Sequence, residues 1–203
     1  GELATAIPIK MNIGIDHISF SFPSGQAETN DELVSAHGFD PGFISEKLGI
    51  DSRLKLAREE TVSELCANAV SQLLEETRLN LERVECIGVV TQTPDYCLPH
   101  TSALVHGQIG LSKKCAAFDI GLGCSGYVYG LSIMRGLMLA EGLSCGVLAT
   151  VDAYSKIMDP KDKATAPLFG DAASATLLRV GGAARLGRTI FGMIKLLPRF
   201  DDG

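Results

Sequence analysis

A single cysteine stands in a run of small residues, DIGLGCSGYVYG, at positions 119–130. Cys124 lies between an apolar strand pattern that ends at Ile120 and an apolar helical pattern that follows it. The first turn of a helix has N–H groups without intrahelical partners and carries the positive end of the helix dipole, and both stabilise a thiolate. The sequence therefore favours a nucleophilic cysteine that can carry an acyl group.

The glycines around Cys124 supply the space that such a nucleophile needs. Gly121, Gly123 and Gly126 permit tight backbone turns and leave room for a substrate to reach the sulfur. The same cysteine has a plainer interpretation, because a free cysteine in an apolar segment commonly packs in the core as a small hydrophobe. The local spacing leaves both interpretations open.

Periodic patterns define the elements that would position this turn. Residues 12–22 predict a strand with a break in phase near His17. The clearest helix begins after Thr61, because Thr61 and Glu64 form a capping box and apolar residues then recur at helical spacing. Between these two elements we expect short helices, each ended by a glycine, at about 30–37 (Gly38) and 41–48 (Gly49).

Beyond the capped helix the chain alternates strands and helices. Further elements are expected as a strand at 86–92, a helix at about 100–109, a strand at 116–120, a long helix after Cys124, a strand at 146–152, a turn feeding a strand at 169–180, and a last strand within 185–200. Continuous apolar strands such as 86–92 and 116–120 are typical of buried strands in a parallel sheet covered on both faces. This order predicts a layered α/β fold with right-handed crossovers.

Composition narrows the classes of function. The 203 residues suffice for one domain with a core, and the net charge of −6 argues against nucleic acid as a partner. No apolar run reaches the roughly 18–20 residues that cross a bilayer, so we expect no membrane span. The six cysteines form no C-x-x-C pair and no zinc-type cluster. We therefore expect no metal and a reducing compartment, the cytoplasm.

Several stretches, in the same order along the chain, resemble one enzyme family. They are the Cys124 motif, the segment at about 29–61 with its L-G-I turn, residues 89–111, and residues 152–178 with D-P-x-D and F-G-D-x-A-x-A patterns. Together these stretches resemble 3-oxoacyl-acyl-carrier-protein synthase III, a family of the thiolase superfamily. The resemblance covers about residues 12–180.

The resemblance implies a thiolase-like layered α/β fold. Residues 12–203 would be one half, the N-terminal half, of a two-half αβαβα architecture whose C-terminal half is absent from this chain. Residues 1–11 are assigned to an N-terminal extension or to residues left from expression. A half-fold of this kind would leave apolar surface uncovered.

The resemblance also implies an activity, that of an acyltransferase. Cys124 would take an acyl group from acyl-CoA, and the thioester would condense with malonyl-acyl-carrier protein with loss of CO2. The backbone N–H of Cys124 would be one oxyanion donor. Acyl-CoA and acyl-carrier protein are then substrates, no cofactor is implied, and a homodimer serving fatty acid biosynthesis in the cytoplasm is expected.

Matching positions suggest residues that bind substrate. Phe43 and Lys47 match the Trp and Arg with which family members hold the CoA adenine, although Lys lacks the planar fork of Arg. Lys163 matches a further basic position, and Leu98 matches a residue that reaches the partner subunit's acyl pocket. The alternative for each is a solvated or packing role. Turn geometry that supports the site is expected of Gly126, Gly170 and Asp171.

The catalytic His and Asn of the family belong to its second half and have no counterpart here. The four histidines all fall in segments that match the first half, where surface or packing roles are expected: His17, His37, His100 and His106. The chain is therefore expected to be incomplete for condensation.

Three other interpretations remain open from the sequence. The first is a non-condensing thiolase-like partner subunit or an acyl-shuttling protein. The second is an enzyme similar to hydroxymethylglutaryl-CoA synthase, which would need a nearby Glu as general base, for which Glu82 and Glu85 are the candidates. The third is an α/β domain in which Cys124 is merely buried.

Overall fold

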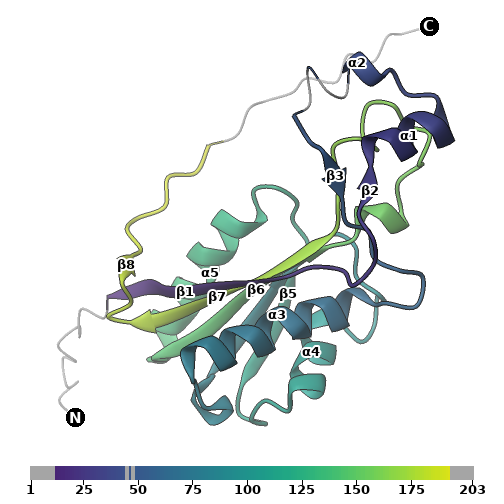
Figure 1. The fold of residues 1–203 in the computed structure, drawn as a ribbon. Helices are drawn as coiled ribbons and strands as arrows, with labels where there is room; N and C mark the ends of the chain where they lie inside the picture. The colour runs from purple at the N-terminus through teal and green to yellow at the C-terminus, as the bar shows by residue number, and fades with distance from the viewer. Residues whose placement is uncertain (1–11, 44–45, 47–48, 193–203) are drawn as a thin grey trace, which may run out of the picture.

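The computed structural model describes residues 12–43, 46 and 49–192. Its centre is a six-stranded mixed sheet in the order β5-β4-β6-β7-β1-β8 (Figure 1). The strands are β1 Ile13–Ser21, β4 Cys86–Val90, β5 Ala116–Ile120, β6 Cys145–Asp152, β7 Ala172–Val180 and β8 Ala184–Arg185. A separate pair of two-residue strands consists of β2 Glu28–Thr29 and β3 Ser52–Arg53.

Helices cover both faces of the large sheet. The helices are α1 Asn30–His37, α2 Pro41–Phe43, α3 Val62–Thr77, α4 Thr101–Ile109 and α5 Gly126–Glu141, with 3-10 turns η2 Leu81–Arg83 and η3 Tyr154–Lys156. On β4, Ile87 and Val89 point into the core under α3 and α4, whereas Val90 points into the core under α5. This alternation follows from the period of two in a strand and confirms the layered α/β fold.

The direction of the strands follows the predicted pattern only in part. β4 runs parallel to β5 and β6, as continuous apolar strands predict, and all five of its residues are buried. β7 runs antiparallel to both β6 and β1, so the sheet is mixed. The expected break in β1 is confirmed, because its register with β7 shifts between Ile15 and His17.

The strand at residues 116–120 was predicted to be buried, but the structure shows it partly exposed. Residues 116–120 do form β5, but β5 is an edge strand that pairs with β4 alone. Ala116 is exposed and the next three residues are only partly buried. An edge strand lacks a neighbour on one side, so its side chains lose the lateral cover that a central strand receives.

Two other elements have bounds that differ from those expected from the sequence. The helix expected at 41–48 is α2 at Pro41–Phe43, and residues 44–45 and 47–48 lie outside the described residues. Of the last expected strand, β8 takes only Ala184–Arg185, and residues 193–203 lie outside the described part, as do residues 1–11.

The N-terminus of α3 shows how the sequence fixes a helix start. The Thr61 side chain accepts from the Glu64 N–H while Glu64 reaches back to the Thr61 N–H, which confirms the capping box. Asp95 adds a second cap, because its carboxylate accepts from the N–H groups of Val62 and Ser63 at 2.7 and 2.8 Å. The helix that begins at these caps packs against β1, β6 and β7.

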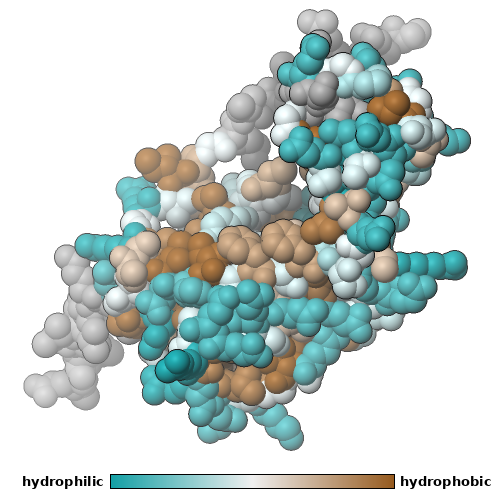
Figure 2. All heavy atoms as spheres, viewed as in Figure 1, coloured by the Kyte–Doolittle hydropathy of each residue, from teal (hydrophilic) through white to brown (hydrophobic). Residues whose placement is uncertain are grey.

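Apolar side chains remain uncovered on this domain. Figure 2 shows hydrophobic residues in a band along β1, where Ile18 and Phe20 are exposed, with Phe22 just beyond. On α5, Val128 and Ile133 are exposed as well. Within the described ranges no helix has both the length and the apolar character to cross a bilayer.

Candidate active site

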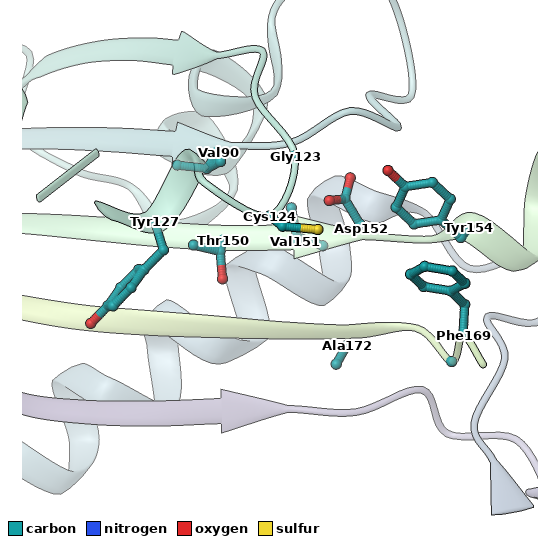
Figure 3. A pocket seen from close by; sticks show the side chains of 11 residues that line it. Val90, Gly123, Cys124, Tyr127, Thr150, Val151, Asp152, Tyr154, Phe169 and Ala172 are labelled. Atoms are coloured by element: carbon teal, nitrogen blue, oxygen red, sulfur yellow. The ribbon is translucent and has the colours of Figure 1, made fainter. Parts of the chain in front are cut away.

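A cavity of about 360 Å³ opens at the carboxyl ends of β4 and β6, beside the turn into α5 (Figure 3). Parallel strands bring their carboxyl ends to one edge, which is where α/β folds commonly place ligands. The turn at residues 121–125, between β5 and α5, is called the elbow. The lining residues come from β4, the elbow, α5, β6, η3, and the start of β7 with the segment before it: Val90, Gly123, Cys124, Tyr127, Thr150, Val151, Asp152, Tyr154, Phe169, Gly170 and Ala172.

Cys124 is exposed and faces this cavity. Figure 3 shows its Sγ directed toward the side where Asp152, Tyr154 and Phe169 lie, whereas Tyr127 extends the other way. The hydroxyl of Tyr127 lies 3.2 Å from the Thr176 hydroxyl. The interpretation of Cys124 as a buried packing residue is therefore wrong.

The elbow that presents Cys124 is a tight turn. The Leu122 N–H donates to the Ile120 carbonyl at 3.0 Å, and the Gly126 N–H donates to the Gly123 carbonyl at 2.7 Å. A Cβ on residue 123 would lie 2.6 Å from Gln92 Oε1, so only glycine fits beside Gln92 without displacing it.

Gly126 lets α5 approach the sheet directly below the elbow. A Cβ at Gly126 would lie 2.4 Å from Val90 Cγ1, and one at Gly130, one turn later, would lie 2.9 Å from Leu148 Cδ1. Both glycines are buried. This close approach fixes the separation between β4 and the N-terminus of α5, and therefore the position of Cys124.

We expect Gly126→Ala to destabilise the fold by about 1–3 kcal/mol, because the added methyl overlaps Val90 and forces α5 away from β4. The matched control is Gly136→Ala on the same helix, where a Cβ meets nothing within 4 Å. That change should stabilise by about 0.5–1 kcal/mol through helix propensity. Urea denaturation measures the free energy of unfolding of both variants. Equal changes in that free energy would contradict the packing role of Gly126.

The N-terminus of α5 differs from those of the other long helices. α3 begins against the Asp95 carboxylate, and α4 begins against Asp119, which accepts from the N–H groups of Thr101 and Ser102 at 2.7 and 2.8 Å. Ser125, which precedes α5, makes no side-chain cap. The Gly126 N–H donates to the Gly123 carbonyl, but no side chain caps the start of α5 beside Cys124. The positive end of this helix therefore favours negative charge on a sulfur or a carbonyl oxygen.

Asp152 ties the ends of β4 and β6 together beside the cavity. Its Oδ1 accepts from the Gln92 N–H at 2.7 Å and from the hydroxyls of Thr91 and Thr93 at 3.3 and 3.2 Å. The Thr93 hydroxyl in turn accepts from the Ala153 N–H at 2.8 Å. The carboxylate therefore fixes the floor of the cavity.

Tyr154 and Phe169 form the aromatic side of the cavity. Their rings stack with centroids 5.1 Å apart, and the Tyr154 hydroxyl donates to Gln92 Oε1. Partial burial raises the pKa of Tyr154, and the nearby Asp152 and Cys124 raise it further. The phenol therefore stays protonated at neutral pH and keeps its role as a donor.

Asp152, Tyr154, Phe169 and Gln92 were not singled out from the sequence. The available signal for Asp152 is a polar residue at the carboxyl end of a buried strand, 146–152. The aromatic residues lie in an irregular segment without periodicity, so no local pattern marks them.

Gly170 and Asp171 lie at the turn into β7. Gly170 lines the cavity, and a Cβ there would lie 3.1 Å from the Leu54 carbonyl oxygen. Asp171 is buried, and its carboxylate accepts from the Leu56 N–H at 2.7 Å and from both the N–H and the hydroxyl of Ser155. These contacts are structural, and they join three segments of chain around the cavity.

Two of the expected substrate-binding residues, Leu98 and Lys163, do not line this cavity. Leu98 is 84% exposed in the loop before α4, and Lys163 is exposed in the turns between η3 and β7. Phe43 ends α2, and Lys47 lies outside the described residues. The role expected of each of these four residues stays a prediction.

The remaining cysteines separate into buried and exposed thiols. Burial raises the pKa of Cys86 to about 12 and that of Cys115 to about 11, and it raises those of Cys66 and Cys145 as well. These four thiols stay protonated at neutral pH. Cys97 is exposed but does not line the cavity.

The histidines hold structural contacts away from Cys124. His17 lies 2.8 Å from Glu76, and His106 lies 3.0 Å from the Ser112 carbonyl. His37 meets the Phe39 ring edge-on, and His100 stands at the start of α4. None of the four lines the cavity.

Neither candidate glutamate for the hydroxymethylglutaryl-CoA synthase interpretation is near Cys124. Glu85 precedes β4 at the amino end of the strand, where it accepts from the N–H groups of Ser144 and Cys145. Glu82 lies in η2. Across the described ranges, no three His, Cys, Asp or Glu side chains are grouped as a metal site would need.

Comparison with known proteins agrees with this geometry. A family model described as 3-oxoacyl-[acyl-carrier-protein (ACP)] synthase III matches residues 118–192, which include the elbow and every cavity-lining residue except Val90. The beta-ketoacyl-[acyl-carrier-protein] synthase III of Lactobacillus helveticus is 38% identical over 151 residues, 74% of this chain and 46% of that protein. A putative 3-oxoacyl-[acyl-carrier-protein] synthase 3 of Campylobacter jejuni is 34% identical over 167 residues, 81% of this chain and 47% of that protein.

Solved structures show the same relationship. A crystal structure of a 3-oxoacyl-(acyl-carrier-protein) synthase III matches with a TM-score of 0.78 and 35% identity, covering 88% of this chain and 52% of that one. The enzyme of the same name from Pseudomonas aeruginosa matches with a TM-score of 0.79 and 30% identity, covering 86% and 55%. The chain spans about half the length of the curated relatives it matches.

Proposed function

Because the chain belongs to the 3-oxoacyl-acyl-carrier-protein synthase III family of the thiolase superfamily, we propose that Cys124 accepts an acyl group from acyl-CoA. The thiolate attacks the thioester carbonyl, a new carbon–sulfur bond forms, and CoA leaves as its thiol. The single observation that carries the proposal is the exposed Cys124, which faces a cavity at the N-terminus of α5, where no side chain caps the helix.

The developing oxyanion needs donors, and the elbow supplies them. The backbone N–H of Cys124 and the uncapped, positive end of the α5 dipole are placed to stabilise negative charge beside the sulfur. This step requires no cofactor or metal. Acyl-CoA and acyl-carrier protein are substrates in this proposal.

The second half-reaction belongs to the complete enzyme. The acyl-cysteine condenses with malonyl-acyl-carrier protein, CO2 leaves, and a 3-oxoacyl product results. The groups that stabilise the enolate lie in the part of the family fold that this chain does not match. Fatty acid biosynthesis in the cytoplasm by a homodimer is the setting that we propose, and the four protonated buried thiols suit a reducing compartment.

The direct test is the intact mass of the protein after incubation with acetyl-CoA, followed by peptide mapping. We expect one acetyl-sized gain, located on Cys124 and removable by hydroxylamine, a reagent that cleaves thioesters. Cys97 serves as the internal comparison because it is equally a free, exposed thiol. A gain spread equally over Cys97 and Cys124, or no gain, would contradict acyl transfer at this elbow.

A second candidate function is acyl shuttling without condensation, for which the exposed Cys124 thiol at the cavity suffices. Malonyl-acyl-carrier protein added to the acetylated protein distinguishes the two. Release of CO2 with a 3-oxoacyl product indicates condensation. Movement of the intact acetyl group to the free thiol of acyl-carrier protein, without CO2, indicates shuttling.

A further inference from the structure

A second, smaller cavity lies at the amino end of β6 and the carboxyl end of β7. Its volume is about 110 Å³, and its lining residues are Leu79, Arg83, Ser144, Cys145, Arg179 and Val180. β6 runs from Cys145 at this cavity to Asp152 at the cavity that Cys124 faces. Because a strand rises about 3.3 Å per residue, roughly 23 Å separate the two ends of β6. The small cavity is therefore distinct from the candidate active site.

Two arginines from separate elements line the small cavity. Arg83 ends η2, and Arg179 lies near the end of β7. A guanidinium group has five N–H donors and no acceptor. Arg179 directs its Nη1 to Asp16 Oδ2 at 3.1 Å, whereas the Arg83 side chain has no hydrogen bond or ion pair with any residue that the structure describes. Both side chains therefore keep donors free for a ligand.

Two carboxylates close to the cavity already have partners. Asp16 holds Arg179. Glu85 Oε2 accepts from the N–H and the hydroxyl of Ser144 at 2.6 and 2.9 Å and from the Cys145 N–H at 3.0 Å. Because the Ser144 hydroxyl donates to Glu85, the strong side-chain donors left for a ligand are those of the arginines.

The charges around the cavity sum to a positive potential at its floor. Burial raises the pKa of the Cys145 thiol, and four charged side chains act on it further. Arg179 lowers that pKa more strongly than Glu85 raises it. Arg83 lowers it more strongly than Asp16 raises it. The two guanidinium groups therefore outweigh the two carboxylates inside the cavity, which favours an anion.

We propose that Arg83 and Arg179 bind a phosphate group in this cavity, between their two guanidinium groups. The planar forks of arginine present pairs of N–H donors that match phosphate oxygens. A water molecule takes roughly 30 Å³ in the liquid, so the cavity has room for a group of a few heavy atoms and not for a nucleotide. Inorganic phosphate and the phosphate end of a monoester share this chemistry. The inference is independent of acyl transfer at Cys124.

The test is an NMR titration of ¹⁵N-labelled protein with sodium phosphate, in which sodium chloride holds the ionic strength constant. The backbone amide signals of Ser144, Cys145 and Val180 should shift along a common saturating curve. The amide signals of Cys124 and Gly126 should not shift. Shifts confined to these last two residues would place the anion at the N-terminus of α5 and overturn the proposal, as would equal shifts with sodium chloride alone.

Arg83→Gln removes one of the two forks and should weaken phosphate binding by at least about fivefold. The control is Arg58→Gln, the same substitution at an exposed arginine outside the cavity, which should change the dissociation constant less than about twofold. The amide spectrum of each variant shows whether it is folded. Equal weakening in the two variants would mean that phosphate responds only to net charge, which would overturn the site.

Arg179→Lys is the second variant, because lysine keeps a positive charge beside Asp16 but lacks the fork. We expect phosphate binding to weaken by about threefold or more. An unchanged affinity in both Arg83→Gln and Arg179→Lys would contradict the proposal. Methyl phosphate distinguishes the two sources of the group. Binding within about twofold of inorganic phosphate indicates a site that admits monoesters, and binding of inorganic phosphate alone indicates a site for the free ion.

Discussion

Replacing Cys124 by alanine is expected to abolish the acetyl-sized mass gain completely while the fold persists. The sulfur is the only atom at the elbow that can form the thioester, and it is exposed, so its loss leaves no cavity in the core. The free energy of unfolding should therefore change by less than about 0.5 kcal/mol, as for surface substitutions. Intact mass spectrometry and urea denaturation measure the two effects separately.

Two variants sharpen this result. Cys97→Ala removes the other exposed thiol and should leave the mass gain intact. Cys124→Ser keeps the size of the side chain, but its hydroxyl is a far weaker nucleophile at neutral pH and has no general base in the cavity lining other than Asp152. An acetyl gain of full size in Cys124→Ala would place the acylated residue elsewhere.

Asp171→Ala is expected to cost about 3–4 kcal/mol of stability, the largest effect on folding that we anticipate from a single change. The buried carboxylate accepts from the N–H groups of Leu56 and Ser155 and from the Ser155 hydroxyl. Its removal leaves two N–H donors without their acceptor, and each such loss costs about 1–3 kcal/mol. The midpoint of urea denaturation should fall accordingly.

The matched control for Asp171 is Asp162→Ala. Asp162 is also a carboxylate in a turn and accepts from the Ala164 N–H and the Thr165 hydroxyl, but it is exposed. Water replaces its hydrogen bonds, so the cost should stay below about 1 kcal/mol. Similar losses in the two variants would show that Asp171 does not join the segments around the cavity as its contacts indicate.

The sequence correctly predicted those elements that depend on residues close to one another along the chain. The α3 start depends on Thr61 and Glu64, three residues apart, and the break in β1 depends on the phase of apolar residues around His17. The Cys124 elbow was predicted for the same reason, since its glycines, the preceding strand and the following helix are contiguous.

Features that depend on distant partners were not predicted. The edge position of β5 is a property of strand order, which the apolar run at 116–120 does not contain. The contacts of Tyr154 with Gln92 and Phe169 join residues spread over more than seventy positions of the chain, and no periodic pattern links them. The same is true of the caps that Asp95 and Asp119 provide to α3 and α4, because each carboxylate comes from a later segment.

The strand order also governs when the sheet can be completed. β1 comes first in the chain, yet β7 separates it from β6, and Ile13 pairs with Val180. During synthesis on the ribosome, β1 must therefore wait without its main partner until β7 has emerged. Contacts between such distant residues slow folding, because the intervening chain must lose its freedom before the pairing stabilises it. A nascent chain that ends before residue 172 would expose β1, with its apolar Phe20, to chaperones and proteases.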